Sequence, residues 1–373
     1  MRKHLVLVGG GHAHMVTLAN ICAFVEKGYD VTVVGPSEYH YYSGMGPGML
    51  GGFYRPEEIR FNTRHVVEKQ GGVFVTGRVT RVDPNKNILF LAGGGTITYN
   101  VVSFNAGSYV PWPVFSGGIE DVYSVKPIEK LYAARERLLA LFQDRKIVVS
   151  IIGGGPSALE VAGNVWRLAR KSRHKPIIKV YAGSGLMSKY SGKIQILARD
   201  SLISRGIEII AGAYIEEMGA GSILLNNGEN VATDFTFIAM GIQPSAIFSE
   251  SGLPVGRDGG LLVNKYLQSE KYPNIFGGGD CICFKPKPLD KVGVYAVREN
   301  PVLYNNLMAS LDEGKLQEFK PGRSSYLLIY NLGNGKGLFK KGPVTYAGRT
   351  AFLFKDHLDR KFMKRFQALE KEG

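Results

Sequence analysis

The sequence has little cysteine and no long hydrophobic run. Only three of its 373 residues are cysteines, which is too few for a disulfide framework, and the spacing of Cys281 and Cys283 does not match a zinc site. We therefore expect reduced thiols, no metal site and a cytoplasmic protein. No apolar stretch approaches the roughly 18 residues of a membrane-spanning helix.

Acidic residues are also scarce relative to basic ones. The chain has 46 Lys and Arg residues against 32 Asp and Glu residues, a net charge of +14. Its 45% hydrophobic content excludes wholesale disorder. The short basic cluster Lys171-Ser172-Arg173-His174-Lys175 has no nucleic-acid recognition motif or aromatic platform beside it, so we expect no nucleic-acid partner.

Glycine, by contrast, is abundant and clustered. There are 48 glycines, and three clusters occupy positions 9–11, 153–155 and 277–279. The first two clusters follow short β-branched runs, and each is followed by a helical pattern and a second strand pattern. This strand–turn–helix–strand order, found twice, predicts an α/β fold with two Rossmann-like dinucleotide-binding domains.

The segments between and after these units predict the domain organisation. Residues 73–75, 78–82 and 88–91 read as an antiparallel meander, and residues 207–210 and 222–225 read as a second one. Pro111-Trp112-Pro113 and Gln243-Pro244 read as linkers. We expect one nucleotide domain split into residues 1–113 and 242–318, a second nucleotide domain at 114–241 inserted into it, and a tail at 319–373.

The first glycine turn reads Gly9-x-Gly11-x-x-His14. Glycines at this point allow a tight strand-to-helix turn and let backbone N–H groups approach a pyrophosphate. His14 replaces the third glycine of the fingerprint, so either the helix packs less closely on the strand or the imidazole reaches the ligand. The acid that usually binds a ribose is missing after the next strand, where Ser37 or Glu38 would have to serve.

The second turn reads Gly153-x-Gly155-Pro156-Ser157, with Ala158 as an accepted third member. Glu160 follows on the first helical turn and is either a partner of the helix dipole or an acid that borders a nicotinamide. The ribose acid is again missing, because Ala182-Gly183-Ser184 follows the second strand. The choice between NADH and NADPH therefore stays open.

The third glycine cluster belongs to the run Asn274–Asp280. This run predicts an edge strand followed by an acidic residue, Asp280. Together with the Gly-His-Ala-His turn, the Tyr42-Ser43-Gly44-Met45 run and the helical pattern after Lys291, it resembles the FAD-dependent pyridine nucleotide-disulfide oxidoreductase superfamily. Within that superfamily the sequence is similar to type II NADH dehydrogenase-like proteins, including the dehydrogenase-like module fused to selenophosphate synthetase. The resemblance covers about residues 4–310.

The resemblance implies FAD as the cofactor and NADH or NADPH as the electron donor. It implies that Asp280 holds the ribityl chain and that Glu160 and Lys291 are catalytic, although a solvated lysine is an equal alternative for Lys291. The implied cofactor-binding residues are Gly9, Gly11, His12, Ala13, His14, Ser37, Tyr42, Ser43, Val79, Ala106, Gly107, Gly153, Gly155, Pro156, Ser157, Gly241, Gly279, Asp280 and Lys291.

Several departures from the family pattern restrict the chemistry. Residues 39–52, where a redox-active cysteine pair would lie, contain no cysteine, which excludes a dithiol mechanism. The Ala-Gln pair of the quinone pocket is absent near Gly293, which makes quinone a less secure acceptor. Cys281 and Cys283 are more plausible as packing residues than as catalytic ones, and we interpret His40 as a surface loop residue rather than a proton donor.

The tail has a pattern of its own. Phe354, Leu358, Phe362 and Phe366 recur every fourth residue, and residues 340–373 carry nine Lys and Arg against four Asp and Glu. A basic amphipathic helix of this kind predicts either a peripheral contact with the inner face of the cell membrane or docking on the body of the protein or a second subunit in a homodimer.

The sequence therefore predicts an enzyme that takes hydride from NAD(P)H onto FAD and passes the electrons to a quinone or similar small acceptor. Two alternatives remain: a sulfide:quinone oxidoreductase-like enzyme, and a non-enzymatic redox-sensing flavoprotein.

Overall fold

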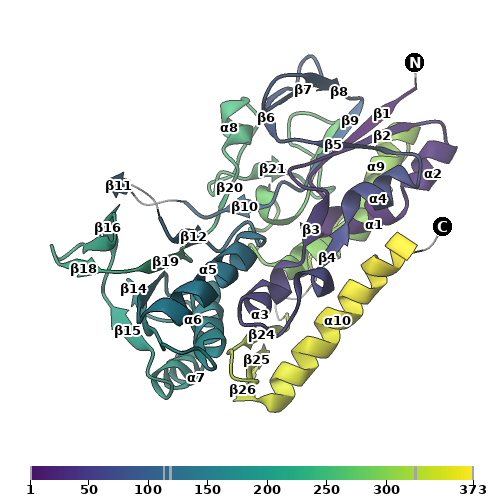
Figure 1. Cartoon of the computed structure of the whole chain (residues 1–373). Helices are drawn as coiled ribbons and strands as arrows, with labels where there is room; N and C mark the ends of the chain where they lie inside the picture. Colours follow the sequence, from purple (N-terminus) through teal and green to yellow (C-terminus); the bar gives the residue numbers. More distant parts are fainter. Residues whose placement is uncertain (1, 112–113, 117–119, 323–325, 372–373) are drawn as a thin grey trace.

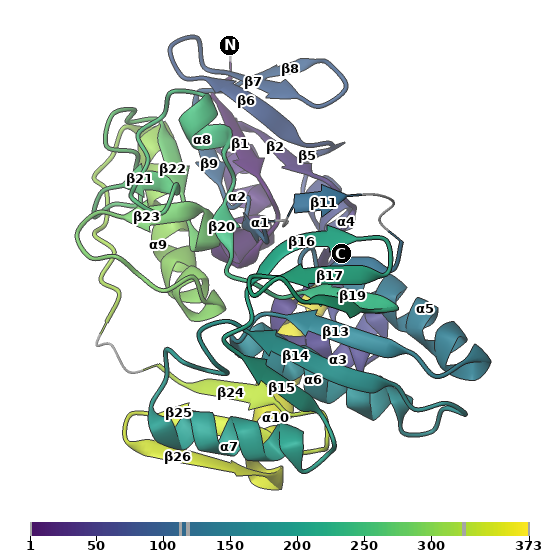
Figure 2. The ribbon, with the colours of Figure 1, turned by 90° about the vertical axis from the view of Figure 1, so that its left-hand side faces the viewer.

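Two five-stranded parallel sheets form the centre of the molecule (Figures 1 and 2). The computed structural model describes residues 2–111, 114–116, 120–322 and 326–371. The first sheet has the order β22-β9-β1-β2-β5, and all of its pairs are parallel. Its strands are β1 (His4–Val8), β2 (Asp30–Gly35), β5 (Val73–Thr76), β9 (Val101–Phe104) and β22 (Ile275–Gly277). The strand expected before Asp280 is confirmed as the last strand of this sheet: β22 pairs with β9 on one side, and on the other side it makes only an isolated antiparallel bridge between Phe276 and Gln268.

The second sheet repeats this plan with the order β12-β19-β13-β14-β15. Its strands are β12 (Val122–Ser124), β13 (Val148–Ile152), β14 (Ile177–Ala182), β15 (Glu208–Ala211) and β19 (Phe235–Ile238). All of β13 pairs in parallel with β14. The prediction of an α/β fold with two Rossmann-like units is confirmed.

Helices follow the glycine turns as expected, with one difference. The predicted single helix after the first turn is divided at Asn20, which leaves helical geometry (φ −132°, ψ 33°) and donates its side-chain N–H to the carbonyl of Val16. The helices around the two sheets are η1 (His12–His14), α1 (Met15–Ala19), α2 (Ile21–Glu26), α5 (Lys130–Asp144), α6 (Pro156–Ala169), α7 (Gly192–Ile203), α8 (Ile247–Glu250) and α9 (Gly293–Asp312).

The two predicted meanders are each wrong in one strand. β5 and β15 are parallel edge strands of the central sheets, not members of the meanders. The first meander consists of β6 (Val79–Asp83), β7 (Ile88–Leu91) and β8 (Thr96–Thr98), and the second of β16 (Ile215–Gly219), β17 (Ser222–Leu225) and β18 (Asn230–Ala232). β11 (Val114–Ser116) joins the second meander in parallel beside β16. Parallel edge strands and hairpin strands of this length share one apolar pattern, so the sequence does not identify their partners.

The expected linkers connect the two domains. Trp112 and Pro113 lie outside the described residues. Gln243–Pro244 forms β20, which pairs with β10 (Ser108–Tyr109) in an antiparallel bridge. The two segments that pass between the domains are therefore joined to each other.

Short elements lie between the strands of the first sheet in the chain or directly follow its last strand. They are β3 (Tyr39–Tyr41), η2 (Ser43–Met45), α3 (Gly46–Leu50), η3 (Pro56–Glu58), β4 (Arg60–Asn62), α4 (Thr63–Glu68), β21 (Leu261–Val263), η4 (Gly279–Cys281) and β23 (Ile282–Phe284). One of them, α3, packs against α5 and α6 of the second domain.

The tail folds back on the body. It forms a three-stranded antiparallel sheet and a long helix, drawn in yellow in Figure 1, which runs beside α4 and β4. These elements are β24 (Leu328–Asn331), β25 (Gly337–Lys341), β26 (Val344–Gly348) and α10 (Arg349–Lys371). None of the helices in the described ranges is both long and apolar enough to cross a membrane.

The phenylalanine stripe of α10 is divided between two faces. Met363 and Phe366 are buried in the hydrophobic cluster that also contains the second sheet, and Phe362 packs against that cluster. Phe354 is 44% exposed and Leu358 is 38% exposed. The sequence pattern therefore combined a buried half and an exposed half into one stripe.

Candidate functional site

The expected cofactor residues of the first domain gather at the carboxyl ends of its parallel strands. The turn at residues 9–14 follows β1, Ser37 follows β2, Ala106 and Gly107 follow β9, and Asp280 follows β22. Val79 is a buried residue at the start of β6, just after β5. Carboxyl ends of parallel strands are where open α/β sheets bind ligands.

Close backbone packing explains the glycines of the first turn. Gly9 has a φ of +94°, and a Cβ there would lie 2.3 Å from the carbonyl oxygen of Asn105. A Cβ at Gly11 would lie 2.2 Å from the side-chain oxygen of Asn105, which also accepts from the N–H of Ala13 at 3.2 Å. Asn105 then donates to the carbonyl of Gly278 at 2.7 Å. Asn105 thus ties the β1 turn to the end of β22, a role that the sequence did not reveal.

His14 occupies the interior side of this turn. Its ring is fully buried, with Nδ1 2.6 Å from the Gly9 carbonyl oxygen and Nε2 2.8 Å from the Ser103 hydroxyl. A carbonyl only accepts, so Nδ1 carries the proton and Nε2 accepts from Ser103. Burial lowers the pKa of His14 to about 4, so the ring is neutral. The imidazole braces β1 against β9, and both of its nitrogens are engaged within the protein.

Asp280 lies in a compact polar cluster. Its Oδ2 accepts from the Lys126 ammonium at 2.8 Å and from the Ser108 hydroxyl at 2.9 Å. Burial alone would raise the pKa of Asp280, but the charge and hydrogen bond of Lys126 outweigh burial and hold the pKa below its usual value. Lys126 is a residue that the sequence reasoning missed, since 154 positions separate it from Asp280.

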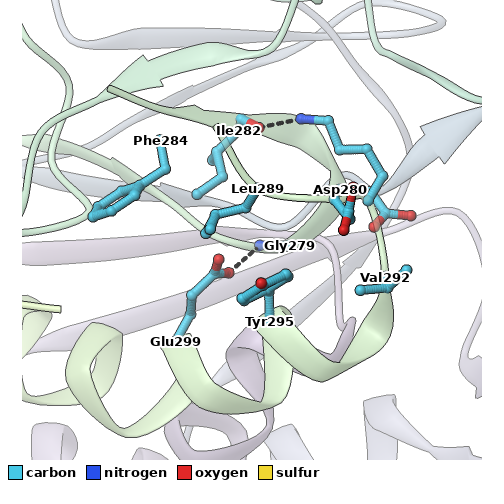
Figure 3. A pocket seen from close by; sticks show the side chains of 10 residues that line it. Gly279, Asp280, Ile282, Phe284, Leu289, Val292, Tyr295 and Glu299 are labelled. Atoms are coloured by element: carbon cyan, nitrogen blue, oxygen red, sulfur yellow. Dashed lines mark hydrogen bonds between the residues drawn. The ribbon is translucent and has the colours of Figure 1, made fainter. Parts of the chain in front are cut away.

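Lys291 and Asp280 line the same pocket, which Figure 3 shows. Its ammonium pairs with Asp258 at 2.8 Å and donates to the carbonyl of Ile282. Its positive charge also contributes to the low pKa of Asp280. In the same pocket the carboxylate of Glu299 accepts from the N–H of Gly279 at 2.5 Å, and burial raises the pKa of Glu299 to about 7.

These residues fit FAD. The two close-packed glycines leave the turn without side chains, so backbone N–H groups can approach a pyrophosphate, and the ionised Asp280 supplies acceptors for hydroxyl groups. His40 adds a ring nitrogen, Nε2, that is buried with no hydrogen-bond partner among the described residues. A ligand with polar groups suits such a surface.

His40 corrects one expectation. It lies in β3 rather than in a surface loop, and its ring packs on His12 and Phe61 with ring-centre distances of 5.6 and 5.2 Å. Burial lowers its pKa to about 3. His12 also contacts Tyr42 and stacks on Phe362 of α10 at 5.4 Å. The turn expected at the pyrophosphate therefore also touches the tail.

The second glycine turn resembles the first at its first glycine, but Gly155 has open space where Gly11 is tightly packed. Gly153 has a φ of +135°, and a Cβ there would lie 2.2 Å from the carbonyl oxygen of Ala239, at the end of β19. Pro156 and Ser157 open α6, and Gly241 follows β19. The nucleotide residues expected in this domain therefore lie together at the carboxyl ends of β13 and β19.

Glu160, on the first turns of α6, belongs to a buried charge cluster. Its Oε1 accepts from the N–H of Asn331 in β24 at 2.6 Å. Burial raises the pKa of Glu160 to about 7, although the nearby charge of Lys355 opposes this shift. No hydrogen bond or ion pair joins Glu160 to Lys291 among the described residues.

Lys355 and Asp359 complete this cluster from α10. The Lys355 ammonium pairs with Asp359 at 2.6 Å and donates to the carbonyl of Gly44 at 2.7 Å. The Tyr42 hydroxyl donates to Asp359 at 3.0 Å. We call Glu160, Lys355, Asp359 and Tyr42 the interdomain cluster, because both nucleotide domains and the tail contribute to it. Charged residues on the inner face of an amphipathic helix were the sequence signal for Lys355 and Asp359.

The thiols are poorly suited to redox chemistry. Cys281 is fully buried, its Sγ lies 3.3 Å from the Gly278 carbonyl oxygen, and burial raises its pKa to about 12. Burial also raises the pKa of Cys283, and Cys22 is exposed. A thiolate is the reactive form of cysteine, so neither Cys281 nor Cys283 has the environment of a nucleophile.

The fold and the site define a class of protein: a flavoprotein with two dinucleotide-binding domains. The chain belongs to the pyridine nucleotide-disulphide oxidoreductase family, whose model matches residues 3–305. It is an FAD-dependent NAD(P)H oxidoreductase, although it lacks the cysteine pair in the segment before Gly52.

Known proteins of this kind are similar over most of their length. Ferroptosis suppressor protein 1 of Taeniopygia guttata is 23% identical over 348 residues, 89% of this chain and 87% of the relative. Sulfide-quinone reductase of Aquifex aeolicus is 22% identical over 97% of this chain and 91% of the relative. Among solved structures, NDH2 of Plasmodium falciparum in complex with NADH has a TM-score of 0.81 at 15% identity, covering 100% of this chain and 98% of that one. These structural likenesses show the shared fold.

Proposed function

We propose that the protein is a type II NADH dehydrogenase-like enzyme that passes two electrons from NAD(P)H through FAD to a quinone. The observation that carries this proposal is the interdomain cluster, which gathers a carboxyl group with a pKa of about 7 and a buried lysine where both nucleotide domains meet the tail. The names of the similar proteins, a sulfide-quinone reductase among them, also favour a quinone as acceptor.

The stoichiometry of the reaction requires a proton donor, and the interdomain cluster contains a suitable one. NAD(P)H, one proton and a quinone yield NAD(P)⁺ and a quinol, so each turnover takes up one proton. FAD, when bound, accepts the hydride and passes the two electrons on. A group with a pKa near the working pH is best suited to supply a proton, which matches Glu160. Tyr42, Asp359 and Lys355 form a hydrogen-bonded chain beside it.

Lys291 has an electrostatic role in this proposal. Asp258 and the Ile282 carbonyl fix its ammonium close to Asp280. A fixed positive charge stabilises negative charge that develops on a reduced cofactor. The buried Glu299 is held by the N–H of Gly279 and keeps the turn before Asp280 in place.

Sulfide oxidation is the less favoured alternative. It needs reactive thiolates, whereas the pKa of Cys281 is raised to about 12 and that of Cys283 is raised as well. A non-enzymatic redox sensor would not need the interdomain cluster.

A double-mixing experiment tests the proposal. The holoenzyme is first reduced anaerobically with NAD(P)H and then mixed with a soluble ubiquinone analogue, with a disulfide or with buffer. We expect the quinone alone to reoxidise the flavin rapidly. Reduction by sulfide but not by NAD(P)H, or reoxidation by the disulfide but not by the quinone, would overturn the assignment.

We also propose that the tail touches an anionic membrane surface. Leu353 is 64% exposed and Phe354 is 44% exposed on α10, and Tyr346 of β26 stacks on Phe339 next to Phe354. The same tail also exposes five basic side chains: Lys341, Arg349, Lys361, Lys364 and Arg365. Exposed apolar side chains on a helix rich in lysine and arginine suit the interface of an anionic bilayer. A second copy of the chain is the alternative occupant.

A further inference from the structure

The carboxyl end of β14 carries no acid. In dinucleotide-binding domains an acid at this point accepts hydrogen bonds from the adenosine ribose and favours NADH. Here the strand ends in Ala182-Gly183-Ser184, and the whole segment 183–193 contains two lysines, three serines and no Asp or Glu.

This segment lies directly against the second glycine turn. The N–H of Met187 donates to the carbonyl of Gly154 at 2.6 Å, and a Cβ at Gly154 would lie 2.5 Å from the carbonyl oxygen of Gly185. The side chains of the segment therefore stand beside the turn that receives the pyrophosphate of a nicotinamide nucleotide. That is the place where the ribose 2′ position of the adenosine half belongs.

Two hydroxyl groups and a lysine are exposed together at this place. Ser184 Oγ lies 3.0 Å from Ser188 Oγ, and both residues are exposed. Lys189 follows Ser188 directly, is exposed, and forms no ion pair with any described acid. Hydroxyl donors and an unpaired ammonium are the groups that bind a phosphate monoester.

An aromatic ring borders the same loop. A Cβ at Gly183 would lie 2.4 Å from the ring of Tyr214, so Gly183 is needed for the ring to lie over the strand end. Tyr214 is 55% exposed and offers a flat surface against which an adenine can stack. The serine hydroxyls and Lys189 suit the phosphate of an adenosine 2′-phosphate, and Tyr214 suits its adenine.

We propose that the enzyme prefers NADPH to NADH and that Ser184, Ser188 and Lys189 bind the 2′-phosphate. This inference rests on the proposed function only in taking a nicotinamide nucleotide as the donor. The 2′-phosphate carries about two negative charges, which an acid at the end of β14 would repel and which Lys189 attracts. NADH lacks the phosphate and meets no acid that would bind its ribose hydroxyl groups.

Two measurements on the holoenzyme test this preference. The first is anaerobic stopped-flow reduction of the flavin over a range of NADPH and NADH concentrations. The second is calorimetric binding of 2′,5′-ADP and 5′-AMP, which involves no hydride transfer. We expect NADPH to have the lower dissociation constant, and Lys189→Ala to weaken NADPH and 2′,5′-ADP roughly ten- to hundredfold while leaving NADH and 5′-AMP unchanged.

Ser184→Asp is the converse variant and should reverse the preference in favour of NADH. Lys171→Ala, which removes an exposed lysine that precedes β14, is the matched control and should change neither donor. Equal or tighter binding of 5′-AMP than of 2′,5′-ADP in the native enzyme would overturn the inference. Preferential binding of 2′,5′-ADP without flavin reduction by either donor would uphold this inference and contradict the proposed function instead.

Discussion

At the scale of single residues, a few buried contacts explain most of the site. Asn105 ties two strand ends together, Lys126 keeps Asp280 ionised, and burial raises the pKa of Glu160 to about 7. The glycine turns and Asp280 could be predicted from the sequence, because their backbone requirements appear as local spacing. Lys126 could not be predicted, because its partner Asp280 is 154 positions away in the chain and only folding brings the two together.

Glu160→Gln tests the proton supply. The raised pKa means that Glu160 carries its proton below about pH 7 and loses it above, so reoxidation of the flavin by quinone should slow as the pH rises through about 7. The amide cannot donate this proton, and the rate should fall about a hundredfold or more and lose that pH dependence. Stopped-flow traces between about pH 5.5 and about pH 8.5 give the rate of flavin reoxidation as a function of pH. Glu136→Gln, at a side chain that is 53% exposed, is the control, and a matching loss in both variants would contradict the role.

Asp280→Ala tests the cofactor assignment. The change removes a carboxylate at the end of β22 and leaves the half-buried Lys126 ammonium without its partner. FAD affinity should fall at least about tenfold, so that purified protein loses flavin absorbance on dialysis. Asp200→Ala, at a side chain that is 63% exposed, should keep its flavin. Full flavin content in the Asp280 variant would count against the assignment.

At the scale of elements, the strands and helices themselves were easier to predict than the strands they pair with or the surfaces they pack against. The runs at β5 and β15 were recognised as strands but assigned to meanders, because strands of four residues have the same apolar pattern in either setting. The tail helix was recognised from its period, yet its stripe gave no indication that Phe366 faces the core and Phe354 faces outward. Burial depends on the surface opposite, which lies elsewhere in the chain.

Two substitutions on α10 separate its faces. Phe366 is 6% exposed within the core cluster, so Phe366→Ala should lower the free energy of unfolding by about 3–5 kcal/mol. Phe354→Ala, at an exposed position of the same helix, should change it by less than about 0.5 kcal/mol. Urea denaturation followed by circular dichroism compares the two. Similar losses would mean that α10 is not docked by the face described.

At the scale of the whole molecule, the tail links the two nucleotide domains and also presents an outer surface. Its inner face supplies Lys355 and Asp359 to the interdomain cluster, and Phe362 to the stack on His12. A change that pulled α10 away from the body would therefore alter the environment of Glu160. This arrangement connects the proposed membrane contact of the tail with the proposed role of Glu160.

Leu353→Glu combined with Phe354→Glu tests the membrane contact. The two carboxylates replace exposed apolar groups and repel an anionic surface, so co-sedimentation with phosphatidylserine-containing vesicles should fall sharply, and wild-type binding should weaken with added salt. Val73→Glu, at a residue 56% exposed on β5, should bind as the wild type does. Unchanged vesicle binding by the double variant would contradict the contact. A loss of self-association in sedimentation velocity instead would identify a second copy as the occupant.

In the proposed mechanism electrons pass through the flavin alone, without a cysteine pair. Anaerobic titration of the holoenzyme with NADPH, followed by flavin absorbance, tests it most directly. Complete bleaching after about one equivalent of NADPH per flavin, unchanged when Cys281 and Cys283 are replaced by alanine, is the predicted result. Consumption of about two equivalents, reduced to about one by those replacements, would reveal a second redox centre made of thiols and contradict the account.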